Sequence, residues 1–392
     1  MSEHAREDIA ALVADETVAE EERKTSFLEL FFDLVFVFAF TQVTALILED
    51  TTAAGFLQAT LVLALVWWAW SAYTWMTNAI DVDNVVTRTI VFAAMAAAFF
   101  MALAVPDAYE DEAAWFAVAY FVVRLLQPAL YAWGVRHDRA QLGAVRSLAP
   151  WFLVAALVAL AGGFVEPGLR AWVWLLSLVI DVVGTLTVAR AGWKVSPSHF
   201  AERFALIVII ALGESIVAIG IGAAELERDT VFVLSVVIAL VGVFALWWSY
   251  FEFTSTAAER SLARAAPEAR AAIARDVFTY FHFPIVLGII YFAVAAEKTL
   301  AHPADPLSGA GRWALGLGLG LFLLAFALMR FRVVRRIAWE RIGAAAVIVV
   351  VAVVLDSPDA PVTLAIVLAV LLAAIAAESY RLREVRRSLR AS

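Results

Sequence analysis

Acidic side chains occur inside apolar segments of this chain, where burial of a charge costs free energy. Glu29 and Asp33 belong to FLELFFDLVFVFAFTQVTALIL, residues 27–48, and Glu214 belongs to HFAERFALIVIIALGESIVAIG, residues 199–220. A carboxylate near the middle of a membrane-spanning helix costs roughly 2.5 to 3.5 kcal/mol on insertion scales, so the protein must use or pair these groups. Asp33 and Glu214 are therefore the first candidates for binding a small cation or a proton.

Polar neighbours share helical faces with these carboxylates. At about 100° per residue, Glu29, Asp33 and Thr44 fall in one narrow sector of their helix, and Thr41 lies at its edge. Glu214 lies about 21 Å into its own segment, too deep to reach water, so it must be protonated, paired or coordinating. The neighbouring candidate ligands are Glu29, Thr41, Gln42 and Ser215.

Basic side chains offer partners for some of these carboxylates. Arg88, at the start of the third apolar segment, is a candidate counter-charge for Asp33; the alternative is that Glu29 and Asp33 only tie helices together near the interface. Arg124 and Asp181 both lie mid-segment, and we expect them to form a structural salt bridge, because breaking it would leave a buried charge. Within the apolar segments, Asp33, Asp181 and Glu214 then outnumber Arg124. This excess of acidic groups favours binding of a cation or a proton over binding of an anion.

Several other kinds of chemistry find no support in the sequence. The chain has no cysteine, which excludes disulfides, thiolate metal sites and cysteine nucleophiles. His282 is the one histidine well inside an apolar segment, so no histidine pair at metal or haem spacing occurs there. A glycine-rich phosphate loop and a mid-segment lysine are also missing. We therefore expect no enzyme activity, no cofactor, no metal centre and no nucleic-acid partner.

Membrane-spanning helices must position these groups. Of the 392 residues, 64% are hydrophobic and 17% are charged, whereas soluble domains are nearer ~45 to 50% apolar. The fold class is therefore all-α, a polytopic membrane protein with the lipid bilayer as a partner. Twelve segments are long enough to cross a bilayer: 27–48, 54–76, 85–105, 113–133, 147–165, 168–190, 200–222, 230–251, 273–296, 311–329, 337–355 and 361–379.

Arginine and lysine are distributed unevenly between alternate connections. With the N-terminus inside, 24 of the 29 basic residues fall on the inner side and 4 on the outer side, while Arg124 stays in the membrane. This bias marks the cytoplasmic side, so we expect both termini in the cytoplasm and a location in the cell inner membrane. Residues 1–26 then form an acidic cytoplasmic tail, and residues 381–392 form a basic one.

The chain also resembles itself at a spacing near half its length. Glu29 matches Glu202 at an offset of 173, and the tryptophan pair at 67–68 matches the pair at 247–248 at an offset of 180. Two halves with an even number of helices share one orientation, so we predict two parallel six-helix repeats related by an axis along the membrane normal. These halves are residues 27–190 and 191–380.

Two of the segments carry a family resemblance. FLELFFDLVFVFAFTQ and HFAERFALIVIIALGESIVAIG resemble the two signatures of the bacterial low temperature requirement A family, and NAIDVDNVVTR, residues 78–88, extends the similarity. The resemblance covers essentially the whole chain. It implies a multi-pass inner-membrane protein linked to growth in the cold, and the family name supplies no molecular activity.

The first segment has a second, weaker resemblance. Residues 31–41 read F-x-D-x-V-F-x-x-A-x-T, which is similar to the first-helix motif of the endolysosomal and bacterial potassium channels built from six-helix repeats. In those channels the motif helix lines the pore. Phe32 replaces their usual serine, and Leu206 stands where the second-half aspartate should be, so the resemblance implies no ion selectivity.

Two classes of function fit these observations. The first is conduction or transport of a small cation or protons, and the sequence leaves both a channel and a coupled carrier open. The second is a non-transporting regulatory or structural membrane protein that supports growth at low temperature. A homo-oligomer is compatible with either class.

Overall fold

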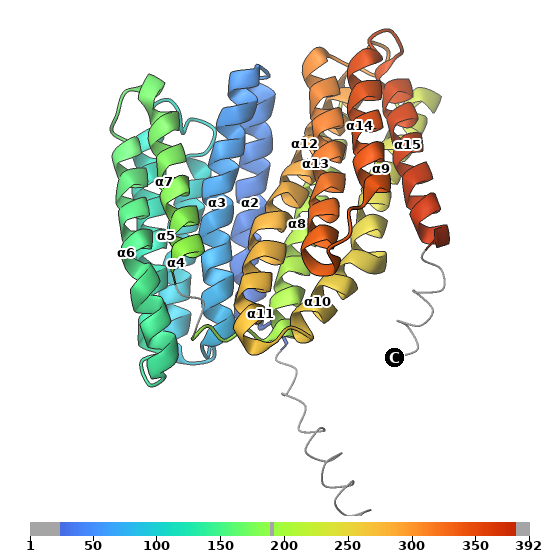
Figure 1. The fold of residues 1–392 in the computed structure, drawn as a ribbon. Helices are drawn as coiled ribbons and strands as arrows, with labels where there is room; N and C mark the ends of the chain where they lie inside the picture. The colour runs from blue at the N-terminus through green and yellow to red at the C-terminus, as the bar shows by residue number, and fades with distance from the viewer. Residues whose placement is uncertain (1–23, 189–191, 382–392) are drawn as a thin grey trace, which may run out of the picture.

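The computed structural model describes residues 24–188 and 192–381, which form a bundle of helices running up and down (Figure 1). The expected all-α, polytopic membrane fold is confirmed, and the described residues contain no β-strand. The first group comprises α2 (Phe27–Glu49), α3 (Ala53–Ala79), α4 (Val85–Leu103), α5 (Ala113–Gly134), α6 (Arg139–Gly162) and α7 (Pro167–Thr187). The second group comprises α8 (Pro197–Gly222), α9 (Thr230–Ser249), η1 (Tyr250–Thr254), α10 (Ser255–Ala263), α11 (Pro267–Ile273), η2 (Ala274–Tyr280), α12 (Phe281–Ala301), α13 (Gly309–Val334), α14 (Trp339–Val354) and α15 (Ala360–Arg381).

Eleven helical spans in the described part are long and apolar enough to cross a membrane. They include two composite spans, Thr230–Ala263 and Ala269–Ala301, each of which runs through a π-helical segment. The twelfth expected segment is α14, whose 16 residues correspond to about 24 Å, somewhat less than a hydrocarbon core of about 30 Å. The number of helical segments therefore agrees with the hydropathy pattern.

Some helices extend beyond the apolar segments that predict them. The charged stretch that follows α9 continues as α10 and α11, which close into a helical hairpin at one end of the bundle (Figure 1). Likewise α6 begins at Arg139, because Asp138 caps the amides of Ala140 and Gln141. The Lys194 ammonium, 2.7 Å from the Asp138 carboxylate, and these amides hold the pKa of Asp138 well below its usual range.

The two groups of helices have a similar order of neighbours. In the first group, α2 packs on α4, α4 on α5, α5 on α6, α6 on α7, and α3 on α7. In the second, α8 packs on α12, α12 on α13, α13 on α14, α14 on α15, and α9 on α15. This shared order is what two parallel repeats would produce, and the repeat itself stays a prediction.

Helices α2 and α8 lie at the junction between the two groups. Figure 1 shows α2 and α3 beside α8 and α12, and α2 contacts both α8 and α12. Ser26 and Glu29 form a capping box that fixes the start of α2, while Pro197 occupies the first turn of α8. Both helices that carry the candidate carboxylates are therefore held in the middle of the molecule.

A stripe of glycines on α13, Gly316, Gly318 and Gly320, brings three helices close together. A Cβ on Gly318 would lie 2.8 Å from the carbonyl oxygen of Gly288 on α12, whereas Gly316 and Gly320 face Val349 on α14. The stripe therefore divides its contacts between two neighbouring helices.

Substitution of Gly318 by alanine is expected to lower the free energy of unfolding by about 1 to 3 kcal/mol, because the added methyl group overpacks the contact with α12. Thermal unfolding in detergent measures the effect. The matched control is Gly343→Ala on α14, where a Cβ meets nothing within 4 Å. Equal or greater stability of the Gly318 variant would contradict the proposed close contact.

Candidate functional site

A buried ion-pair cluster joins the N-terminal parts of α2 and α8. Arg203 on α8 is 0% exposed; its Nη1 lies 2.9 Å from Glu29 Oε1 and its Nη2 lies 2.6 Å from Asp33 Oδ1. Trp70 Nε1 on α3 also donates to Asp33 Oδ1, at 2.8 Å. One guanidinium thus serves two carboxylates from the neighbouring helix, and it neutralises the charge expected to bind a cation at Asp33.

His199, one turn before Arg203, extends the cluster. Its Nε2 lies 3.1 Å from Glu29 Oε2, and its Nδ1 lies 2.9 Å from the Asn78 amide nitrogen. Since an amide nitrogen can only donate, Nδ1 accepts and Nε2–H donates to Glu29. Asn78 also accepts from the backbone N–H of Ser196. The network therefore links α2, α3 and the start of α8 through one neutral imidazole.

The expected counter-charge of Asp33 is corrected from Arg88 to Arg203. Arg88 Nη2 lies 2.8 Å from Asp83 Oδ1, and both side chains are about half or more exposed, at 49% and 77%. Arg88 reaches back to the loop before α4 because Asn84 caps that helix and keeps the loop close to its first turn. A sequence signal for the true partner exists: His199 and Arg203 are four residues apart and share one helical face.

The cluster is almost closed to solvent. Asp33 Oδ2 and Arg203 Nε are buried and have no hydrogen-bond partner among the described residues. A cavity of about 10 Å³ lies against Glu29, Thr77 and Arg203, and one water needs about 10 to 15 Å³. The cluster therefore has room for no more than a single water at this point.

Glu214 occupies a different environment, further along α8. Its side chain is 2% exposed, and Thr41 Oγ1 on α2 donates to Glu214 Oε2 at 2.6 Å. Glu297 on α12 is close enough for the two carboxylates to repel each other when both are ionised. Within the described ranges no basic side chain forms an ion pair with Glu214. This carboxylate is therefore buried without a counter-charge.

The other predicted neighbours of Glu214 take different positions. Ser215 is buried, and its Oγ donates to the carbonyl oxygen of Ile289 on α12 at 3.4 Å. Gln42 is half-buried on α2, one position beyond Thr41. The structure thus shows a hydrogen bond to Glu214 from Thr41, whereas no hydrogen bond to Glu214 is seen from Ser215 or Gln42 in the described residues. Glu297, which the sequence analysis missed, lies near the end of an apolar segment, where a carboxylate looks like a solvated group.

Apolar packing separates the two clusters. Arg203 and Glu214 are 11 residues apart on α8, which corresponds to about 16 Å. Phe36 and Phe40 of α2 and Ile207 of α8 lie between these levels and are 0 to 1% exposed. Buried apolar side chains therefore lie between the Arg203 cluster and Glu214.

Arg124 and Asp181 form the salt bridge expected from the sequence. Arg124 Nη2 on α5 lies 2.7 Å from Asp181 Oδ1 on α7, and both side chains are almost completely buried. The guanidinium also lies over the ring of Phe152 on α6, 4.8 Å from its centroid. The pair therefore ties three helices of the first group together. In the part of the chain with described placement, no group of three or more acidic or histidine side chains could hold a metal ion.

Comparisons with known proteins agree with the family resemblance. The family model described as "Bacterial low temperature requirement A protein (LtrA)" matches residues 24–377. "Uncharacterized protein RA0937" of Rhizobium meliloti (strain 1021) is 33% identical over 332 residues, which cover 81% of this chain and 79% of that relative. No solved structure matches. The chain is therefore a multi-pass membrane protein that belongs to the bacterial low temperature requirement A family.

Proposed function

We propose that this protein moves protons or a small cation across the membrane, with Glu214 as the ion-binding carboxylate. One observation carries the proposal: Glu214 is buried in a spanning helix beside Thr41, without a basic partner among the described residues. A buried carboxylate without a counter-charge must hold a proton or a cation to be stable there. Exchange of that proton or cation with either side is the elementary step of transport.

In this proposal the Arg203 cluster has a gating role rather than a binding role. Asp33 is engaged by Arg203 and Trp70, so a cation could bind there only after the guanidinium moves away. Two carboxylates, one guanidinium and a neutral imidazole leave one excess negative charge, which a proton on the cluster would balance. The cluster can therefore couple a proton to the relative positions of α2 and α8.

The buried apolar side chains between the two polar levels favour a carrier over an open pore. Phe36, Phe40 and Ile207 pack between the two polar levels, so an ion would need the helices to separate before it could pass. A coupled carrier alternates between such closed arrangements, whereas an open channel has a continuous polar lining. On this proposal, the arrangement of α2 and α8 corresponds to an occluded state of the carrier.

The proposal places the protein in the bacterial inner membrane with both ends in the cytoplasm. The support is the excess of arginine and lysine on the side of the termini, 24 against 4, and the even number of expected segments. On this orientation the Arg203 cluster lies near the cytoplasmic side, and Glu214 lies in the outer half of the membrane.

Flux of potassium, sodium and protons into proteoliposomes tests the function. We expect transport of at least one of these ions by the wild type and a loss of at least about tenfold in Glu214→Gln, because the amide cannot carry the charge. The matched control is Glu225→Gln, an exposed position just beyond α8, which should transport at the wild-type rate. Undiminished flux in folded Glu214→Gln would remove Glu214 from the pathway.

The second candidate is a non-transporting regulatory or structural protein. The paired state of Asp33 favours it, since a carboxylate held by Arg203 and Trp70 can serve helix assembly alone. If the wild type moves none of the three ions and Glu214→Gln is at least as stable as the wild type, this second function replaces the first.

A further inference from the structure

Two threonine hydroxyls of α2 interact with Glu214. Thr41 Oγ1 lies 2.6 Å from Glu214 Oε2, and the Thr44 hydroxyl also interacts with this carboxylate. Ser215 Oγ is directed to the carbonyl oxygen of Ile289 instead. Among the residues with described placement, no group of three or more acidic or histidine side chains is arranged to hold a metal ion. The described contacts thus give Glu214 two hydroxyl neighbours besides its own two carboxyl oxygens.

The backbone around this site offers no further ligands. A dehydrated metal cation needs a shell of about six or more oxygen atoms, and carriers of sodium obtain part of it from the free carbonyl groups of broken helices. Here α2 is a regular α-helix through Thr41 and Thr44, and α8 is one through Glu214, so their carbonyl oxygens accept helical hydrogen bonds. The site therefore supplies too few oxygens for a metal cation, whereas a proton needs only one.

Each of the two threonine hydroxyls also has a backbone acceptor. Thr41 Oγ1 lies 3.3 Å from the carbonyl oxygen of Val37, and Thr44 Oγ1 lies 3.1 Å from that of Phe40. A hydroxyl group has one hydrogen to donate but can also accept. When Glu214 is ionised, Thr41 donates to it and loses Val37 as an acceptor. When Glu214 is protonated, its O–H group donates to Thr41, and both threonines keep their backbone acceptors.

Glu297 on α12 lies further toward the outer end of the bundle than Glu214. A Cβ on Gly222, eight residues beyond Glu214 on α8, would lie 2.7 Å from the carbonyl oxygen of Glu297, so the last turns of α8 and α12 are in direct contact. Glu297 is half-buried, and its carboxylate interacts electrostatically with that of Glu214. On the orientation proposed above, Glu297 is a second carboxylate between Glu214 and the outer solution.

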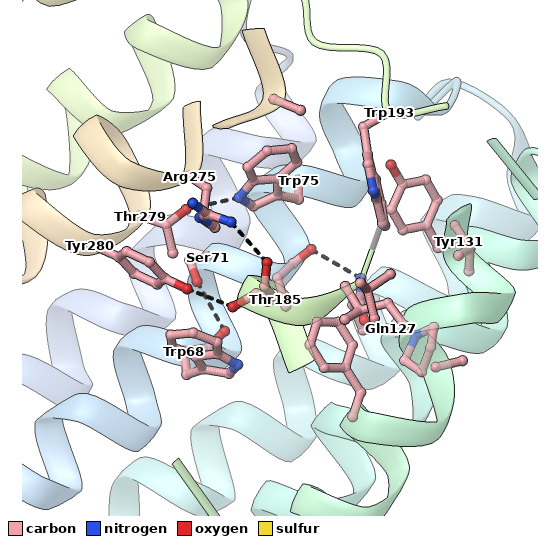
Figure 2. A pocket seen from close by; sticks show the side chains of 18 of the residues that line it. Trp68, Ser71, Trp75, Gln127, Tyr131, Thr185, Trp193, Arg275, Thr279 and Tyr280 are labelled. Carbon is pink, nitrogen blue, oxygen red and sulfur yellow. Dashed lines mark hydrogen bonds between the residues drawn. The ribbon is translucent and has the colours of Figure 1, made fainter. Parts of the chain in front are cut away.

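No comparable group leads from Glu214 toward the cytoplasmic side. A cavity of about 90 Å³ lies between α3, α5, α6, α7 and η2, and Figure 2 shows the side chains around it. None of the side chains that line it belongs to α2 or α8, so it does not reach Glu214. On the inner side of Glu214 lie the buried Phe36, Phe40 and Ile207. The described arrangement therefore favours exchange outward, past Glu297.

We propose that the ion carried at Glu214 is a proton, and that Glu297 exchanges this proton with the outer solution. The inference rests on the proposed transport function and narrows it to one ion. Once the outer part of the bundle opens to water, the carboxyl O–H bond of Glu214 breaks, an O–H bond forms on the Glu297 carboxylate, and no electrons are exchanged. Glu297 then releases the proton outward, and the reverse sequence loads Glu214 from outside.

Infrared spectroscopy of the full-length protein in nanodiscs tests the protonation of Glu214. At neutral pH we expect the carbonyl band of a carboxylic acid in the wild type, its loss in Glu214→Gln, and a shift of its frequency in Thr41→Val, which removes the hydroxyl acceptor. Addition of Na⁺ or K⁺ to the wild type should leave the band unchanged. Absence of the band, its persistence in Glu214→Gln, or its loss on addition of either cation overturns the inference.

Proton flux into proteoliposomes without Na⁺ or K⁺ tests the role of Glu297. We expect proton transport by the wild type, a rate at least about tenfold lower in Glu297→Gln, because the amide cannot take up a proton, and a largely retained rate in Glu297→Asp. Glu225→Gln, at an exposed position just beyond α8, should match the wild type.

The outcomes of the flux experiment separate this inference from the proposed function. Transport of Na⁺ or K⁺ without protons would overturn the inference and leave the transport function in place. Transport of none of the three ions would overturn both. An unchanged proton flux in Glu297→Gln would remove Glu297 from the path.

Discussion

Replacement of Arg203 by methionine is expected to lower the free energy of unfolding by about 3 to 5 kcal/mol, because it leaves buried charges without their partner. Glu29 and Asp33 would both lose the guanidinium that lies 2.9 and 2.6 Å from their oxygens. Methionine preserves much of the packing of the side chain, so the loss reports mainly on charge. Chemical or thermal unfolding in detergent gives the measurement.

A second substitution separates charge from packing at this cluster. Asp33→Asn in the Arg203→Met background should recover part of the lost stability, because it removes one of the two unpaired charges. Arg139→Met, at an exposed position in the first turn of α6, is the matched control and should change stability by less than about 0.5 kcal/mol. If Arg203→Met is no less stable than this control, the ion pairs do not hold α2 against α8.

The hydropathy pattern could predict most of the fold because a bilayer imposes a length and a polarity on every span. It could not predict the exact ends of the helices. Residues 252–272 are charged and look like a loop, yet much of this stretch forms α10 and α11. Such polar segments continue a helix when local hydrogen bonds and packing support it, and mean hydropathy contains no information about either.

The candidate site could be predicted only in part. Asp33 and Glu214 stand out in the sequence because burial of a carboxylate in an apolar segment costs free energy. The structure places both side chains in buried surroundings. The partner of Asp33 was missed, since Arg203 lies 170 residues away and counts toward the basic residues of the inner side. Charge bias along the sequence does not distinguish an interfacial arginine from one that turns inward. Tertiary packing decides that choice.

The sequence also could not predict the cavity of about 90 Å³ that lies between α3, α5, α6, α7 and η2. Tryptophans in a membrane protein are expected mainly at the interfaces with water. Trp68 and Trp75 are seven residues apart and share a face of one helix, but no sequence signal brings Trp193 to them. They meet because α3 and the 192–196 connection pack against a helix whose turn is widened at Ala274–Tyr280. A cavity lined by several helices in this way becomes visible only after the helices are placed.

Loss of Arg124 is expected to have an effect as large as that of the loss of Arg203, but for a purely structural reason. Arg124→Met leaves Asp181 without its only ion-pair partner in the described part of the chain, at a site where both side chains are almost completely buried. Removal of one partner of such a pair costs about 3 to 5 kcal/mol. The guanidinium also loses its position over Phe152, which adds to the loss.

A double-mutant cycle then tests whether the pair is structural. Arg124→Met combined with Asp181→Leu replaces the pair by apolar groups, and buried pairs replaced in this way are often neutral or stabilising by about 1 to 4 kcal/mol. We therefore expect the double variant to be close to the wild type in stability, while each single variant is much less stable. Ion flux per folded molecule should also be retained in the double variant, because Arg124 and Asp181 lie among α5, α6 and α7, away from Glu214. A stable double variant without flux would show that the pair takes part in transport and would move the pathway into the first helix group.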